Sequence, residues 1–194
     1  MDVVLFQVFQ AAITLPFLFF ISFYRKKATF KPLITKHWVH LVKISLLVVI
    51  VIGVYSLITL TATSAFNWVG FSCTVMGTVL VAKAKLDLSK SHTWAGFCIE
   101  KPKLVAGGIY SYVRHPLYVG VYLFVFGVLI SLIVSSSWQL TIIAFLALVY
   151  VLSFLSVVAK RETNSLEKSL GAEFSDYKKK VHFCLPIRKY IQKK

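Results

Sequence analysis

Long apolar runs alternate with short polar segments along this 194-residue chain. Five of the runs approach the ~20 residues that cross the hydrocarbon layer of a bilayer as a helix. The pattern therefore predicts an all-α integral membrane protein with five transmembrane helices. The expected spans are residues 3–24, 38–60, 66–86, 116–134 and 138–159.

Basic residues are confined to one set of connections between these runs. All 22 Lys and Arg residues fall within residues 25–43, 83–114 and 160–194. Basic loops are retained on the cytoplasmic side of a membrane, so we predict that these stretches are cytoplasmic and that the N-terminus is outside. Five spans in a chain of this length leave no room for a separate soluble domain, so we treat residues 1–194 as one membrane domain.

The net charge of +15 is compatible with nucleic-acid binding, but its placement beside apolar spans favours contact with anionic lipid headgroups. The three cysteines lie too far apart for a disulfide framework or a paired metal motif. His37 and His40 have no further candidate ligands nearby in the sequence. We therefore expect membrane lipids as partners, and neither nucleic acid nor a metal ion.

Small residues recur at helical spacing in the third and fourth spans. Such residues let two helix backbones approach closely inside a bilayer, so the pattern predicts tight packing of these two spans. The residues are Gly70, Thr74 and Gly77 in the third span and Gly120, Gly127 and Ser131 in the fourth.

The segment just before the fourth span holds the densest polar chemistry. Gly107 and Gly108 allow the backbone to approach a ligand, and a helix start offers free amides and a positive dipole end to an anion. Arg114 could add a bidentate clamp on a carboxylate or phosphate. In the alternative interpretation, Pro116 simply begins the helix, and Arg114 and His115 contact lipid headgroups.

A second polar segment follows the fifth span. Its apolar positions have helical spacing, which predicts an amphipathic helix over residues 160–190 that prolongs the fifth span. Glu162 falls at the membrane edge, on the side facing the rest of the protein, whereas Glu167 and Glu173 are expected in solvent. A partly buried carboxylate is costly unless it is paired, so Glu162 should meet a basic side chain or a cationic ligand.

Two motifs carry a resemblance to a known family. The first is Gly108-Ile-Tyr-x-x-x-Arg-His-Pro-x-Tyr118, and the second combines Glu162-x-x-x-Leu with Leu170-Gly-x-Glu-Phe-x-x-Tyr177. With the helical hairpin between them, they resemble the short prokaryotic members of the isoprenylcysteine carboxyl methyltransferase family. The matching, catalytic part runs from about residue 101 to residue 187.

The resemblance implies an integral membrane enzyme that transfers a methyl group from S-adenosylmethionine and releases S-adenosylhomocysteine. It places the cofactor in a cytoplasmic pocket formed by the loop between the third and fourth helices and the C-terminal helical tail. The chain has no G-x-G-x-x-G and no alternation of strands with helices, which agrees with binding outside a Rossmann domain. The implied acceptor is the C-terminal carboxylate of an isoprenylated cysteine, or a similar lipophilic molecule that enters from the bilayer.

The resemblance also assigns site residues. Arg114, His115 and Glu162 are the expected catalytic residues, and Glu162 would accept from the methionine ammonium or the ribose hydroxyls. Two positions depart from the family: Thr163 replaces a frequent second acid, and Val158 replaces an arginine that longer members link to substrate. The implied cofactor contacts are Pro102, Lys103, Leu104, Val105, Tyr110, His115, Pro116, Leu117, Tyr118 and Glu162.

Three alternatives to this activity remain open. Phospholipid methyltransferases and sterol reductases carry sequences similar to the Arg-His-Pro-x-Tyr core, so a phospholipid N-methyltransferase or a sterol-type NADPH-dependent reductase is possible. A transporter or scaffold is less compatible with the sequence, because the five runs contain no acidic residue in their central turns.

Overall fold

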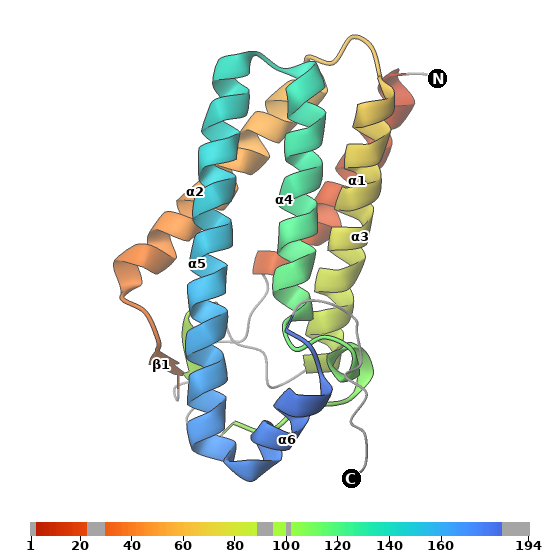
Figure 1. Cartoon of the computed structure of the whole chain (residues 1–194). Helices are drawn as coiled ribbons and strands as arrows, with labels where there is room; N and C mark the ends of the chain where they lie inside the picture. Colours follow the sequence, from red (N-terminus) through yellow and green to blue (C-terminus); the bar gives the residue numbers. More distant parts are fainter. Residues whose placement is uncertain (1–2, 23–29, 89–94, 100–101, 184–194) are drawn as a thin grey trace.

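Five long helices form the body of the molecule in the computed structural model, which describes residues 3–22, 30–88, 95–99 and 102–183 (Figure 1). Each helix is long and apolar enough to cross a membrane, which confirms the predicted all-α membrane fold. The helices are α1 (Val3–Ser22), α2 (Lys36–Ile58), α3 (Ala65–Leu88), α4 (Pro116–Ser135) and α5 (Trp138–Leu170).

Helix α5 is longer than a membrane requires. Its 33 residues span about 50 Å, whereas the hydrocarbon layer is about 30 Å thick. Residues 160–170, which we call the α5 extension, therefore project beyond the predicted span. They confirm the first part of the predicted amphipathic helix.

The predicted continuation of that helix to residue 190 is wrong. The backbone turns at Gly171, whose φ of +57° is a left-handed conformation that favours glycine. A separate helix, α6 (Ala172–Lys180), then folds back beneath the bundle, and Val181 is extended (Figure 1). Residues 184–194 lie outside the described residues.

Helices α3 and α4 pack with their backbones in contact. A Cβ atom added at Gly77 would lie 2.6 Å from the carbonyl oxygen of Gly120, and one added at Gly120 would lie 2.8 Å from that of Gly77. Gly70 and Gly127 face each other in the same way two turns away. The predicted close packing of the small-residue positions is thus confirmed. Helix α4 also contacts α2 and α5, and α1 packs on α3, so α4 lies at the centre of the bundle.

Short elements connect the helices at the end of the bundle that carries α6. Strands β1 (Phe30–Pro32) and β2 (Phe97–Ile99) pair antiparallel and join the connection before α2 to the one after α3. The 3₁₀ turn η2 (Gly108–Ser111) precedes α4, and Val113 pairs with His182 in a parallel bridge. The sequence did not predict the strands, because three residues are too few for a periodic pattern.

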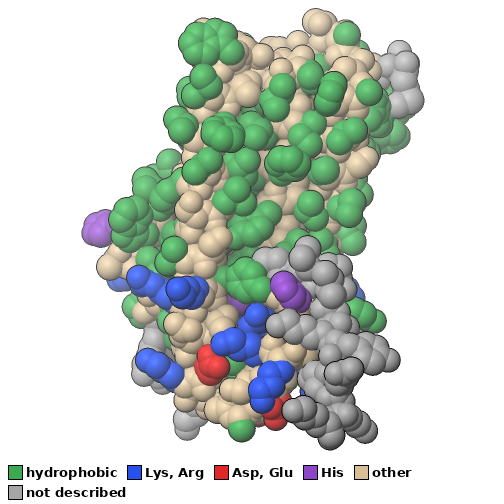
Figure 2. Space-filling view, in the orientation of Figure 1, with side chains coloured by type: hydrophobic (Ala, Val, Ile, Leu, Met, Phe, Trp, Pro, Cys, Tyr) green, Lys and Arg blue, Asp and Glu red, His purple; other side chains and the backbone are tan. Residues whose placement is uncertain are grey.

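The surface divides into an apolar body and a charged end. On the face shown in Figure 2, apolar side chains are spread along the long part of the bundle, and the visible charged side chains gather at the end with α6. This division agrees with the predicted placement of basic stretches on one side of a membrane, which stays a prediction. The assignment of that side to the cytoplasm also stays a prediction.

Candidate active site

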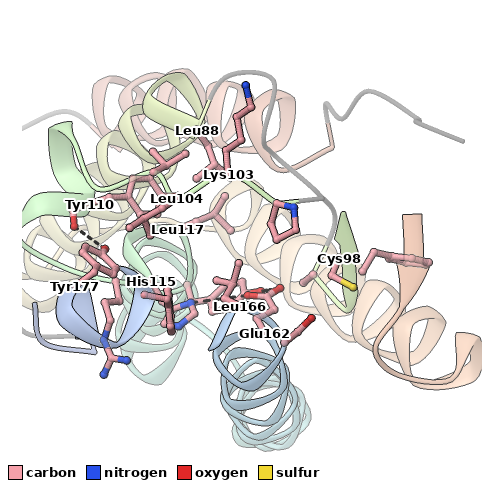
Figure 3. A pocket seen from close by; sticks show the side chains of 18 residues that line it. Leu88, Cys98, Lys103, Leu104, Tyr110, His115, Leu117, Glu162, Leu166 and Tyr177 are labelled. Atoms are coloured by element: carbon pink, nitrogen blue, oxygen red, sulfur yellow. Dashed lines mark hydrogen bonds and ion pairs between the residues drawn. The ribbon is translucent and has the colours of Figure 1, made fainter. Parts of the chain in front are cut away.

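A cavity of about 170 Å³ opens at the charged end of the bundle (Figure 3). It lies between the loop before α4, the first turn of α4, the α5 extension and α6. All the site residues predicted from the sequence line it, with the exception of Pro116. The lining residues are Leu88, Ala95, Phe97, Cys98, Pro102, Lys103, Leu104, Val105, Tyr110, Arg114, His115, Leu117, Tyr118, Glu162, Ser165, Leu166, Phe174 and Tyr177.

Pro116 has a structural position instead. It is buried as the first residue of α4, where a missing N–H costs no helical hydrogen bond. The ring presets the backbone for the helix, so His115 and Tyr118 are held about one turn apart. Their rings lie nearly parallel, with centroids 5.4 Å apart.

Glu162 brings a carboxylate from the α5 extension to this pair of rings. The Tyr118 hydroxyl donates a hydrogen bond of 2.6 Å to Oε1, and His115 Nδ1 lies 3.8 Å from Oε2. The Glu162 side chain is only 19% exposed, so these contacts replace most of its hydration. We refer to His115, Tyr118 and Glu162 as the site cluster.

His115 supplies no positive charge to this carboxylate at neutral pH. Burial, and then the nearby charge of Arg114, lower the pKa of His115 to about 4. Its Nε2 lies 3.3 Å from the Thr163 hydroxyl, at the position where the resembling family often has a second acid. Among the described residues, the polar partners of Glu162 are therefore a phenol and a neutral imidazole. Burial raises the pKa of Glu162 to about 7, against the opposing effect of the hydrogen bond from Tyr118, so the carboxyl is only partly ionised at neutral pH. A cation in the cavity would favour the ionised form and offset the cost of burying it.

The predicted free amides at the start of α4 are largely occupied. The Arg114 amide donates to the His182 carbonyl at 3.0 Å, and the His115 amide donates to the Phe183 carbonyl at 3.3 Å. The amide of Tyr118 bonds to the carbonyl of His115. Carbonyl groups of the segment after α6 thus accept hydrogen bonds from backbone amides that we had expected to bind an anion. The Arg114 side chain lines the cavity as a further candidate for anion binding, and its guanidinium lies 5.8 Å from the centre of the Phe183 ring.

Aromatic residues form the wall opposite Glu162. The Tyr177 hydroxyl donates a hydrogen bond of 2.7 Å to the Tyr110 carbonyl and joins α6 to η2 at one side of the cavity (Figure 3). Burial raises the pKa of Tyr177 to about 12 and that of Tyr110 far above its usual value, so both phenols are protonated at neutral pH. The ring of Phe174 packs 5.9 Å from that of Tyr177. This wall offers aromatic faces beside a carboxylate.

Several lining residues were not predicted as site residues. Leu166, Phe174 and Tyr177 had a signal, because they belong to the second motif and follow helical spacing. Phe97 and Cys98 had none, because they reach the cavity from β2, whose pairing depends on distant residues. The other unpredicted lining residues are Leu88, Ala95 and Ser165.

Two residues near Glu162 lie apart from the cavity. Val158, at the position of the family's substrate-linked arginine, is fully buried. Arg161 donates a hydrogen bond of 2.7 Å to the Leu33 carbonyl and ties the α5 extension to the segment before α2. Neither lines the cavity, so this chain does not place an arginine there from α5. Within the described residues, no group of three or more His, Cys, Asp and Glu side chains could hold a metal ion.

Comparison with known proteins identifies one family. A family model described as phospholipid methyltransferase matches residues 65–172, which run from the first residue of α3 to the first residue of α6. The match covers more than half of the chain and includes the cavity loop and the α5 extension. A search of the curated proteins found no match.

Proposed function

Since the chain belongs to the phospholipid methyltransferase family, we propose that it transfers a methyl group from S-adenosylmethionine to a lipophilic acceptor at the membrane surface. The observation that carries this proposal is the site cluster. A mostly buried carboxylate lines a cavity, and its described partners are both uncharged at neutral pH. S-adenosylmethionine has two cationic groups, an ammonium and a sulfonium, that could complement such a carboxylate.

The lining residues fit the rest of this cofactor. Glu162 would hold the ammonium or the ribose hydroxyls, and the Arg114 guanidinium would pair with the carboxylate. Tyr110 and Tyr177 offer aromatic faces for the adenine or the sulfonium. When bound, the cofactor supplies a methyl group that is activated by its positively charged sulfur.

The chain itself contributes position and exclusion of water. The hydrogen bond from Tyr118 fixes the orientation of the Glu162 carboxylate, and the contact between Tyr177 and Tyr110 holds α6 against the loop. Methyl transfer requires an in-line approach of acceptor and donor, so a fixed cofactor pose supplies much of the acceleration. Apolar side chains such as Leu104, Leu117 and Leu166 line the same cavity and keep water from competing.

For the acceptor we propose the C-terminal carboxylate of an isoprenylated cysteine, on the basis of the two sequence motifs. This nucleophile is already ionised at neutral pH, so the transfer needs no general base. Its product is a methyl ester. The family match favours a second candidate, the amine of a phospholipid headgroup, which must lose a proton before it attacks. Both acceptors have lipid chains and would reach the site from the bilayer.

The test is methyl transfer by purified protein in phosphatidylcholine proteoliposomes supplied with tritiated S-adenosylmethionine. One set of vesicles contains a farnesylated cysteine analogue, and the other contains phosphatidylethanolamine. Methyl transfer to the analogue supports the isoprenylcysteine carboxylate as the acceptor. Methyl transfer to phosphatidylethanolamine alone contradicts it and supports the phospholipid amine. Saturable binding of NADPH with no binding of S-adenosylmethionine by folded protein would contradict the methyltransferase proposal and support a reductase.

A further inference from the structure

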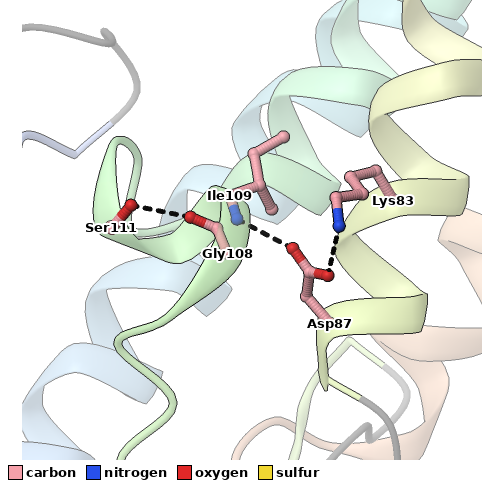
Figure 4. A network of polar contacts seen from close by, with 5 residues as sticks. All are labelled: Lys83, Asp87, Gly108, Ile109 and Ser111. Carbon is pink, nitrogen blue, oxygen red and sulfur yellow. Dashed lines mark hydrogen bonds and ion pairs between the residues drawn. The ribbon is translucent and has the colours of Figure 1, made fainter.

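One polar network beside the cavity has no role in the proposed chemistry so far (Figure 4). Asp87, at the end of α3, accepts a hydrogen bond of 2.7 Å from the Ile109 amide at Oδ2 and one of 2.7 Å from Lys83 Nζ at Oδ1. Its side chain is only 15% exposed, and it does not line the cavity. Asp87 also lies outside both sequence motifs.

The turn that Asp87 contacts is too short to hold its own shape. η2 has four residues, and isolated turns of this length are unstable because few hydrogen bonds offset the lost backbone entropy. Gly108 begins the turn with a φ of +59°, and a Cβ atom there would collide with the Asp87 carboxylate. Glycine is therefore required at this position for two reasons, its backbone conformation and its closeness to Asp87.

This turn carries Tyr110, one residue of the aromatic wall of the cavity. Tyr110 follows Ile109 directly, is 7% exposed and lines the cavity. Its carbonyl accepts the hydrogen bond from Tyr177 in α6. A chain of contacts therefore runs from Asp87 through the turn to α6, so a shift of the turn would move both tyrosines.

We propose that Asp87 is a positioning residue, whose carboxylate holds the Gly108–Ser111 turn so that Tyr110 faces the bound cofactor. This role rests on the proposed function and deepens it. A residue outside the aromatic wall would determine how that wall faces the cofactor. The ion pair with Lys83 is secondary. The Lys83 side chain is 55% exposed, and exposed ion pairs contribute little.

Three variants separate these contributions. Asp87→Ala removes both interactions, Asp87→Asn keeps an oxygen that can accept from the Ile109 amide, and Lys83→Met removes only the ion pair. The affinity for S-adenosylmethionine is measured by calorimetry in detergent, and the KM for the lipid acceptor is measured separately. Hydrogen–deuterium exchange of the peptide covering residues 102–115, without cofactor, reports the turn directly.

We expect Asp87→Ala to weaken cofactor binding about tenfold, to speed exchange in the turn and to leave the acceptor KM within about twofold. Asp87→Asn should weaken binding about threefold, and Lys83→Met should leave it within about twofold. Equal cofactor affinity for Asp87→Ala and wild type would overturn the positioning role. Parallel losses in cofactor affinity and acceptor KM would also overturn it, since they indicate a general structural defect.

If Asp87→Ala does not fold, Asp87→Leu decides, because it keeps a side chain of similar size and cannot accept from the Ile109 amide: wild-type affinity together with wild-type exchange overturns the role. Failure of folded wild-type protein to bind S-adenosylmethionine would instead overturn the proposed function itself. The two failures are thus distinguishable in one set of titrations.

Gly108→Ala gives an independent test through its coupling to Asp87. In the wild-type background the added methyl group meets both an unfavourable φ and the Asp87 carboxylate. In the Asp87→Ala background only the unfavourable φ remains. The loss of cofactor affinity caused by Gly108→Ala should therefore be at least threefold smaller in that background. Equal losses of cofactor affinity in the two backgrounds would show that the contact with Asp87 does not hold the turn.

Discussion

The two ends of the bundle each hold a polar cluster, and the clusters differ in one respect. At the end away from the cavity, Asn67 is 2% exposed, donates to Ser135 Oγ at 2.7 Å and accepts from the Ser64 amide at 2.8 Å. We call these three residues the far-end cluster. It is neutral, and the amide group of Asn67 both donates and accepts within it. The site cluster contains a carboxylate whose described partners are uncharged at neutral pH.

This difference indicates what each cluster does. A neutral cluster with internal hydrogen bonds can be buried at little cost, and it holds neighbouring helices together. A buried carboxylate beside neutral partners is costly, and a protein retains such a group where a ligand compensates it. We therefore expect changes in the far-end cluster to reduce stability, and changes in the site cluster to reduce ligand binding.

The largest expected effect is that of Glu162→Gln. The substitution keeps the shape of the side chain and removes its charge, so the affinity for S-adenosylmethionine should fall by two to three orders of magnitude, about 3 to 4 kcal/mol. Glu167→Gln is the matched control, because Glu167 lies on the same extension and pairs with Lys178 away from the cavity. Calorimetry on both variants checks this. If the two variants bind S-adenosylmethionine with equal affinity, the charge of Glu162 does not contribute to cofactor binding, and the proposed role of the site cluster is wrong.

The next effect is a dependence of stability on pH. His115 has a pKa of about 4 in the folded protein against about 6.5 in the unfolded chain, so the unfolded state binds more protons between these values. The His115 contribution is fully present above pH 6.5 and is lost as the pH falls to 4, by on the order of 3 kcal/mol. Burial raises the pKa of Glu162 to about 7 against about 4.5 in the unfolded chain, so the Glu162 contribution changes in the opposite direction over nearly the same range.

Denaturant unfolding in detergent from pH 4 to 7.5 measures the two contributions together. The difference in the free energy of unfolding between wild type and His115→Asn isolates His115 and should fall by on the order of 3 kcal/mol as the pH drops from 6.5 to 4. A difference that does not change with pH would show that His115 is not buried in its neutral form.

A smaller effect is expected at the far end. Asn67→Leu leaves the hydrogen-bonding groups of Ser64 and Ser135 without the amide, which should lower the free energy of unfolding by about 2 kcal/mol. Because Asn67 lies far from the cavity, the affinity for S-adenosylmethionine should stay within about twofold. Thermal unfolding and calorimetry on the same preparation test both statements. A large loss of affinity would mean that the two ends are coupled.

The smallest effect concerns one hydrogen bond of the site cluster. Tyr118→Phe keeps the ring beside His115 and removes the donor to Glu162, so cofactor affinity should fall about tenfold. Tyr122→Phe is the control, since Tyr122 lies on the next turn of α4 and does not line the cavity. If both substitutions have the same effect, the hydrogen bond to Glu162 does not orient the carboxylate.

The helices were predictable because the signals for their existence and ends are local. Hydropathy located all five, and Pro116 marked the first residue of α4. The end of α5 was missed although Gly171 was visible. The apolar positions Leu166, Leu170 and Phe174 continue at helical spacing across the glycine, and this pattern outweighed the local signal for a break.

Ten residues predicted from the motifs line one cavity, whereas the contacts between them could not be predicted. Tyr110, Tyr118 and Glu162 belong to the two motifs, and all three line the same cavity. The hydrogen bond between Tyr118 and Glu162 depends on how α4 and α5 are rotated about their axes, which hydropathy does not determine. Asp87 could not be found from sequence, because its partner Ile109 is 22 residues away and contributes only a backbone amide.

The most direct test is an experimental structure of the protein with S-adenosylhomocysteine bound. The account predicts the ligand in the cavity between residues 102–118, the α5 extension and α6, with its amino group within hydrogen-bonding distance of Glu162 and its carboxylate near Arg114. A ligand bound elsewhere, or bound in this cavity with its amino group turned away from Glu162, would contradict the assignment of the site cluster as the cofactor site.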